Sequence, residues 1–151
     1  MRIIRTTLFI ALATLLFGKT GFAIQAKGDS ISGDDLHYLG YVMLNGDTSA
    51  WVNIENDDVY YLSKALFYRT PDVLKYLKND DLYFLGAALI YGNKDELDKI
   101  LQDDFYFLGT AIFDKNEDYL DNIRRDDIYY LGKGLLTRDF NYLNEISTKT
   151  K

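Results

Sequence analysis

The stretch DDLYFLGAALIYGNKDELDKILQ, residues 80–102, decides the fold because the chain repeats it almost unchanged. The next stretch, residues 103–125, reads DDFYFLGTAIFDKNEDYLDNIRR, and the preceding one, residues 57–79, reads DDVYYLSKALFYRTPDVLKYLKN. Asp-Asp pairs recur every 23 residues without an insertion. They mark five units, with bounds 34–56, 57–79, 80–102, 103–125 and 126–148. A fixed period of this kind is the signature of repeat architectures, in which each unit packs on its neighbours.

Each unit begins with a pattern typical of an α-helix. If the first Asp is numbered position 0, apolar residues stand at positions 2, 5 and 9, which are Leu82, Leu85 and Leu89 in the third unit. This spacing places the three side chains on one face of a helix. An Asp at position 0 is a good N-cap, and a second Asp beside it is favoured by the helix dipole. We therefore predict a first helix of about eleven residues that begins at position 0.

A second, short helix is predicted in the rest of each unit. The first helix is expected to end near position 12, where Gly46 and Gly92 suit a left-handed C-terminal cap. Position 13 then carries an N-cap residue type in every unit: Asp47, Thr70, Asn93, Asn116 and Asp139. Apolar residues follow at positions 17 and 20, such as Leu97 and Ile100. Neither helix is long enough to be stable alone in water, so each pair must bury its apolar face against neighbouring pairs.

The predicted fold is therefore all-α, an α-solenoid of five 23-residue helix-turn-helix repeats over residues 34–148, with one extended core. Four units carry glycine at position 6, in the middle of the first helix: Gly40, Gly86, Gly109 and Gly132. A mid-helix glycine costs about 1 kcal/mol relative to alanine, so some other interaction must offset it. We expect these glycines to let neighbouring first helices approach closely, by facing the small residues at position 8 of the next layer.

Residues 1–23 are predicted to be a secretory signal peptide. Two arginines precede an apolar run from Leu8 to Phe17, and Ala23 stands where a signal peptidase would cleave. A run of about ten apolar residues is too short to span a bilayer, so no stable membrane insertion is expected after cleavage. Residues 24–33 are then a flexible lead-in to the repeats. The mature protein is expected in the periplasm or outside the cell, and the sequence leaves both locations open.

Composition narrows the classes of ligand and partner. The chain has no cysteine, so a disulfide framework is excluded. Loss of residues 1–23 would remove three basic residues and no acidic one, leaving 14 basic against 23 acidic residues and a net charge of −9. This charge argues against a nucleic-acid or anionic-membrane partner. The Asp pairs lack the Asp-x-Asp-x-Asp-Gly loop of EF-hands and are explained by helix capping, so neither a metal nor a cofactor is predicted.

Tyrosines in the first helices are the candidate binding residues. Position 3 is Tyr in four of the five units, and position 4 is aromatic in all five. Both flank the strip of the helix that faces away from the core, where positions 7 and 11 vary most between units. Tyrosine is over-represented at binding hot spots, although these rings could instead fill the grooves between layers. We predict a protein-binding site made of Tyr60, Lys64, Tyr68, Tyr83, Tyr91, Tyr106, Asp114 and Lys133.

The paired helices resemble those of a known repeat family. The stretches ALFYRTPDVLKYLKN, residues 65–79, and AALIYGNKDELDKILQ, residues 87–102, are similar to the helix pairs of ankyrin repeats. The 23-residue period leaves no room for the β-hairpin of that family. The resemblance implies protein binding across a concave surface and does not identify a partner.

The leading hypothesis is an exported repeat module that binds another protein or a peptide. In its concrete form it is an immunity or inhibitor protein that neutralises a toxin in the cell envelope by covering a basic cleft. The alternative is an envelope scaffold or assembly factor with several weak partners. An enzyme acting on cell-wall material is disfavoured, because no residue left unexplained by packing has the geometry of a general acid or base. The sequence leaves the oligomeric state open.

Overall fold

The computed structural model of the chain describes residues 30–149, with side chains to residue 146. The predicted signal peptide and most of the predicted lead-in lie outside these residues. The described part is all-α, and a helix-turn unit recurs about every 23 residues. The first helices of the five units are α2 (Gly33–Asn45), α3 (Asp57–Tyr68), α4 (Asp80–Tyr91), α5 (Asp103–Asp114) and α6 (Asp126–Thr137).

The second element of a unit is a 3-10 helix in four cases: η1 (Thr48–Asn53), η2 (Pro71–Tyr76), η3 (Lys94–Lys99) and η4 (Glu117–Asn122). In the fifth unit it is an α-helix, α7 (Phe140–Lys149). Six residues stand between the N-cap at position 13 and the C-cap at position 20. Tighter 3-10 hydrogen bonding suits so short a segment. The N-cap at position 13 is confirmed by Asp47, Asn93 and Asn116, whose side chains accept from backbone N–H groups two residues later.

The predicted N-cap at position 0 is wrong, because the N-cap stands one residue earlier in α3 to α6 and two residues earlier in α2. Asn56 and Asn79, one position earlier, cap α3 and α4, and each accepts a hydrogen bond of 3.0 Å from the backbone N–H three residues later. Ser32 caps α2 in the same way and forms a reciprocal capping box with Asp35. The first Asp of each pair therefore lies inside the first helical turn, where its charge suits the helix dipole.

In the first four units, the second Asp of the pair binds the backbone at the end of its own unit, just before the next first helix begins. Asp58, Asp81 and Asp104 each accept a hydrogen bond from a backbone N–H twenty residues later, at 2.6 to 2.8 Å. Asp35 accepts two, from the residues at positions 55 and 56. In the fifth unit Asp127 instead pairs with the Arg125 guanidinium, which also donates to the backbone oxygen of residue 31 at 3.0 Å. The last unit is thereby tied to the beginning of the described chain.

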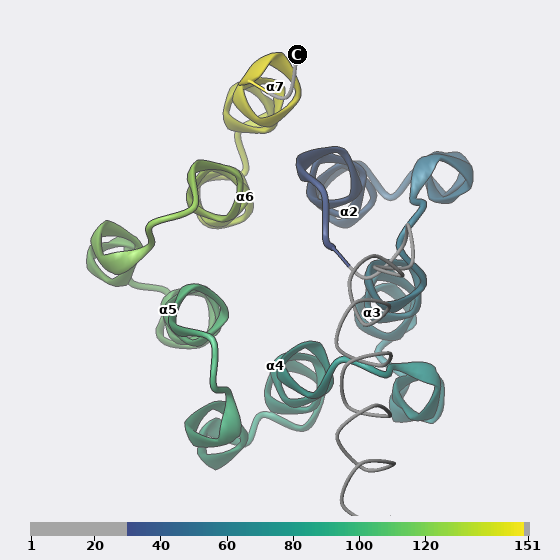
Figure 1. Ribbon diagram of the computed structural model, residues 1–151, viewed down its shortest axis with the longest axis vertical. Coiled ribbons are helices and arrows are strands. Elements are labelled where there is room, and N and C mark those ends of the chain that lie inside the picture. The colour runs from purple at the N-terminus through teal and green to yellow at the C-terminus, as the bar shows by residue number, and fades with distance from the viewer. Residues whose placement is uncertain (1–29, 150–151) are drawn as a thin grey trace, which may run out of the picture.

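The five units close into a ring instead of forming an open stack. Helices α2 to α6 surround a common axis, with the 3-10 helices on the outside (Figure 1). Helix α2 packs against α6 and α7 as well as against α3. The five units were expected to stack as layers of an extended core, and they are arranged in a circle. The apolar faces of the five first helices meet at its centre. Position 5 fills this centre with buried leucines: Leu39, Leu62, Leu85, Leu108 and Leu131.

The glycines at position 6 are notches that receive leucines of the preceding unit. A Cβ atom added to Gly86 would lie 2.7 Å from a methyl of Leu74 in η2 and 2.9 Å from a methyl of Leu62 in α3. Gly109 and Gly132 have the same surroundings, supplied by positions 17 and 5 of their own preceding units. The glycines therefore do allow close packing, but against leucines and not against the small residues at position 8.

The same contact closes the ring. A Cβ atom on Gly40, in the first unit, would lie 2.6 Å from Leu143 in α7 and 2.9 Å from Leu131 in α6. The fifth unit therefore meets the first as any unit meets the one that follows it. His37 adds a polar contact at this junction, because its Nδ1 lies 2.8 Å from the backbone oxygen of Leu143.

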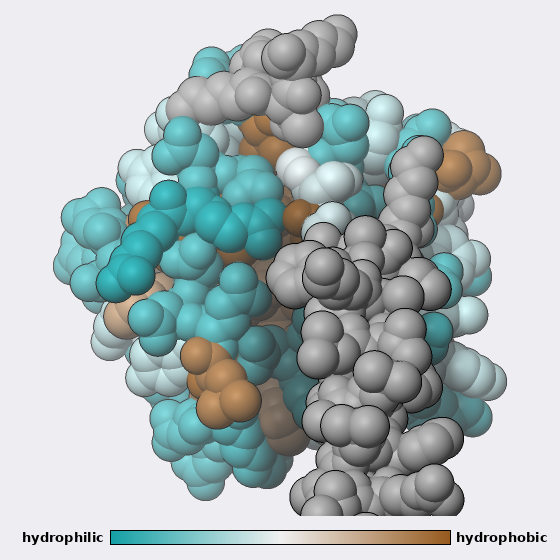
Figure 2. Space-filling model, in the orientation of Figure 1, coloured by the Kyte–Doolittle hydropathy of each residue, from teal (hydrophilic) through white to brown (hydrophobic). Residues whose placement is uncertain are grey.

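The face seen in Figure 2 is mostly hydrophilic, and hydrophobic side chains are visible toward its middle. Among residues 30–149 no helix has the length and apolar character needed to cross a membrane.

We expect Gly86→Ala to destabilise the fold, although alanine is the better helix former by about 1 kcal/mol. The added methyl would force Leu74 and Leu62 apart, and overpacking of this kind costs about 1–3 kcal/mol. Urea unfolding followed by circular dichroism would measure the change. The control is Gly92→Asn, at a left-handed position with open space around it, and it should be nearly neutral. A Gly86→Ala variant more stable than the parent would contradict the notch.

We expect alanine substitution of two adjacent aspartates, Asp103 and Asp104, to lower the free energy of unfolding by very different amounts. Asp104 is buried and accepts from the backbone N–H of Arg124 at 2.8 Å, so Asp104→Ala should cost about 1–3 kcal/mol of unfolding free energy. Asp103 is exposed and makes only a helix-dipole interaction, so Asp103→Ala should cost less than about 1 kcal/mol. Urea midpoints of the two variants give the comparison, and equal losses would contradict a connecting role for the second Asp.

Candidate functional site

The ring holds a cavity of about 930 Å³ at the C-terminal ends of α2 to α6. Its floor is the layer of buried leucines at position 5. Its wall is made by position 9 of each helix, with further apolar residues from the last helical turns and from Phe140. The five residues at position 9 are Met43, Leu66, Leu89, Ile112 and Leu135.

Position 9 differs from the other two inward positions in its burial. Residues at positions 2 and 5 are fully buried, whereas all five at position 9 are partly exposed. The helical spacing predicted that position 9 faces the centre of the fold, and it does. The centre is filled at the level of positions 2 and 5 and open at the level of position 9. The outcome is a hydrocarbon-lined cavity in place of the third layer of a core.

Three basic residues stand at the mouth of this cavity. They are Arg69, Lys115 and Arg138, at position 12 of the second, fourth and fifth units. All three have a left-handed backbone, with φ of 50°, 53° and 56°, and the equivalent residues of the other two units are Gly46 and Gly92. Left-handed backbone is easy for glycine and costs other residues roughly 1–2 kcal/mol. Every residue with a side chain at this position is thus a cation.

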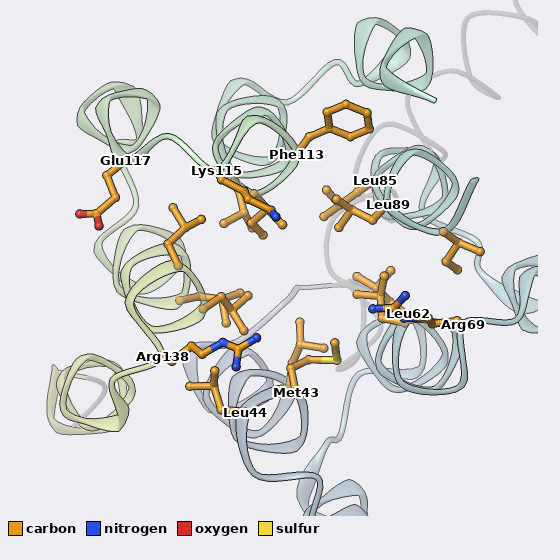
Figure 3. A pocket seen from close by; sticks show the side chains of 18 of the residues that line it. Met43, Leu44, Leu62, Arg69, Leu85, Leu89, Phe113, Lys115, Glu117 and Arg138 are labelled. Carbon is orange, nitrogen blue, oxygen red and sulfur yellow. The ribbon is translucent and has the colours of Figure 1, made fainter. Parts of the chain in front are cut away.

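These cations extend over the cavity from three sides of the ring (Figure 3). Within residues 30–149 none of the three forms an ion pair or a side-chain hydrogen bond, and all three are exposed. Glu117 also lies at the rim, but its carboxylate is bound by Lys133 at 2.6 Å and points away from the cavity (Figure 3). The mouth therefore carries positive charge that no described carboxylate neutralises.

The residues predicted for protein binding lie on the outer side of the ring and separate into groups. Tyr60, Lys64 and Tyr68 surround Trp51 of η1. The Lys64 ammonium lies 4.4 Å from the centre of the Tyr60 ring and 5.3 Å from that of the indole. This arrangement is a cation-π cluster that stabilises the packing of η1 against α3.

Asp114 and Lys133 are engaged in ion pairs with neighbouring units. Asp114 binds Lys94 at 2.6 Å, and Lys133 binds Glu117 at the same distance. The hydrogen bond that Lys94 donates to Asp114 raises the pKa of Lys94, and the one that Lys133 donates to Glu117 raises the pKa of Lys133. Both pairs are solvent-exposed in large part, so they contribute little to stability.

Tyr83 and Tyr91 on α4 are exposed, whereas Tyr106 on α5 is partly buried against the core. The tyrosines with the largest exposure among the described residues are Tyr68, Tyr76, Tyr83 and Tyr91, at 59, 52, 38 and 61%. We call these four the tyrosine surface, which belongs to α3, η2 and α4. The predicted eight residues therefore do not form one band around the ring, and the prediction that they bind a protein stays a prediction.

The cavity and the three cations at its mouth were not predicted from the sequence. The signal for the cations was present at position 12, which reads Gly, Arg, Gly, Lys, Arg through the five units. Its two glycines alone predict left-handed C-terminal caps. Position 9 was assigned to the core because periodicity gives the direction of a side chain and not the space in front of it.

No family model, curated protein or solved structure matches this chain. The regular helix and 3-10 units, packed consecutively, define a helical repeat without assigning a family.

We expect Trp51 and Ser63 to be energetically coupled. The indole N–H donates to the buried Ser63 hydroxyl at 2.8 Å, and the pair replaces the leucine and glycine that other units place at positions 17 and 6. Trp51→Leu leaves a buried hydroxyl without its donor, and Ser63→Gly leaves the indole without its acceptor, so each should cost about 1 kcal/mol or more. The double variant restores the leucine-glycine pair and should lose less than the sum of the two.

Urea unfolding of the two single variants and the double variant, followed by circular dichroism, measures this coupling. The control cycle pairs Trp51→Leu with Ser49→Gly, an exposed serine on the same 3-10 helix, and should be additive. Additive losses in both cycles would mean that the pair is not a unit.

Proposed function

We propose that the protein is an exported, non-enzymatic module that binds another protein through the tyrosine surface on α3, η2 and α4. The observation that carries the proposal is the concentration of exposed tyrosines between residues 68 and 91. In the fourth and fifth units the residues equivalent to Tyr68 and Tyr91 are Asp114 and Thr137. Single exposed apolar residues are ordinary, but several large aromatic side chains exposed on three consecutive elements of a small protein favour an interaction site.

Two further observations support this proposal. The tyrosine ring offers a large apolar area with a polar tip and loses little side-chain entropy on binding, which suits a hot spot. In sequence, residues 65–79 and 87–102 resemble the helix pairs of ankyrin repeats, and this resemblance implies protein binding. Because the units close into a ring, binding is assigned to its outer side and not to the concave surface of an open stack.

In its concrete form, the proposal is an immunity or inhibitor protein that neutralises a toxin in the periplasm or outside the cell. The net charge of −6 favours a basic partner, because complementary charge speeds association. An envelope scaffold with several weak partners is the second candidate, which the variation of positions 7 and 11 between units would also suit.

A pull-down from envelope extract with the tagged, exported full-length protein would test the proposal. The variant carries Tyr68→Ser, Tyr83→Ser and Tyr91→Ser. The control carries Val52→Ser and Leu101→Ser, which remove apolar side chains that are 87 and 90% exposed elsewhere on the ring. Removal of hot-spot tyrosines should weaken binding at least about tenfold, whereas the control should bind as the parent does.

One protein retained in a one-to-one complex, and lost only with the tyrosine variant, would support the inhibitor. Many partners at low occupancy would support the scaffold. Retention of the same proteins by parent, variant and control would contradict a role for the tyrosine surface, provided that all three are equally helical.

A further inference from the structure

We propose that the cavity at the C-terminal ends of α2 to α6 binds an amphiphile that has one aliphatic chain and an anionic head group. The chain would lie against the apolar wall, and the head would bind Arg69, Lys115 and Arg138 at the mouth. This site is inside the ring and is separate from the tyrosine surface outside it.

The wall and floor define the apolar part of the ligand. All five position-9 residues and all five position-5 residues carry hydrocarbon or thioether side chains, so the interior below the mouth offers no polar group to a ligand. The volume of about 930 Å³ lies in the usual range of sites that take small molecules. Partly exposed leucines in a concave surface gain free energy when an apolar chain displaces water from them.

The mouth defines the head group. Three cations from three different units project over one opening, in a chain whose net charge is −6, and none has a partner in residues 30–149. Guanidinium and ammonium groups form strong, charge-assisted hydrogen bonds with carboxylates and phosphates. The combination of hydrocarbon below and converging cations above matches an anionic amphiphile.

The helix dipole offers a second explanation for the three cations. Five helices direct their C-terminal ends toward the mouth, and a cation at such an end offsets the helix dipole. That explanation accounts for the sign of the charges. It does not require an open, hydrocarbon-lined space beneath them, and it predicts that loss of the charges lowers stability without affecting ligand binding.

The experiment uses the purified full-length protein and the fluorescence of a dansyl-labelled fatty acid. The matched probe is the dansyl-labelled alcohol of the same chain length, which keeps the apolar chain and lacks the charge. The fatty acid should bind at least about tenfold more tightly than the alcohol. Displacement by laurate or by dodecyl phosphate then distinguishes a carboxylate ligand from a phosphate ligand.

The charge variant carries Arg69→Asn, Lys115→Asn and Arg138→Asn. Asparagine tolerates the left-handed backbone at these positions, so the fold should persist. The control variant carries Lys75→Gln, Lys78→Gln and Arg124→Gln, an equal change of net charge away from the cavity. Affinity for the fatty acid should fall about tenfold or more in the charge variant alone, and affinity for the alcohol should be unchanged.

A third variant, Ile112→Trp, would narrow the cavity from its wall and should weaken binding of both probes. Leu89→Phe, a smaller increase in volume on the neighbouring helix α4, serves if the tryptophan prevents folding. The tyrosine-surface variant should bind the fatty acid as the parent does, so failure here is distinguishable from failure of the proposed function.

Several results would overturn the proposal. No binding of either probe, equal binding of acid and alcohol, or an unchanged affinity in the charge variant would each exclude an anionic head group at the mouth. Undiminished binding by a folded Ile112→Trp or Leu89→Phe variant would place the ligand elsewhere. A charge variant that loses stability and keeps its affinity would establish the helix-dipole explanation instead.

Discussion

The rest of the structure depends on the insertion of a leucine at position 17 into the glycine notch at position 6 of the following unit. A side chain larger than hydrogen at the notch would collide with that leucine and with the leucine at position 5 of the preceding unit. The absence of a Cβ atom therefore sets how closely a unit approaches the one before it. Since the same contact recurs, each unit turns relative to its predecessor in the same sense, and the fifth turn brings Leu143 to Gly40. The first junction follows the same rule in altered form, with Trp51 bonded to Ser63.

Closure explains how such short elements form a stable fold. Open solenoids need terminal units with a polar outer face, because their first and last apolar faces have no neighbour. Here the first and last units cover each other. The second Asp of each pair adds a directional connection, since it fixes the backbone that leads into the next unit. In the fifth unit Asp127 binds Arg125 instead, and the Arg125 guanidinium donates to the backbone oxygen of residue 31.

The sequence predicted those features that depend on local pattern. The 23-residue period, the first helices and the caps at position 13 follow from residue type and spacing, and all three are present. The N-cap was misplaced because Asp at position 0 is as good a cap by type as Asn56 or Asn79 one residue earlier. Closure of the ring depends on the angle between neighbouring units. Contacts such as that of Leu74 with Gly86 set this angle. The spacing of residue types along the sequence does not reveal it. The cavity was missed for a related reason. Residue type at position 9 is the same whether the space in front of it is filled or empty.

The ring also determines which residues can act together. Equivalent positions on the outer side face five different directions, so no single ligand of small size can contact position 11 of every unit. The tyrosine surface accordingly occupies only α3, η2 and α4. Equivalent positions on the inner side converge instead. The apolar residues at positions 5 and 9 of all five units therefore line a single cavity. The units differ from one another at the mouth of the cavity. Position 12 reads Gly, Arg, Gly, Lys and Arg from the first unit to the fifth. A uniform ring would offer a ligand no preferred orientation. The three cations and two glycines therefore remove the fivefold repetition at the mouth.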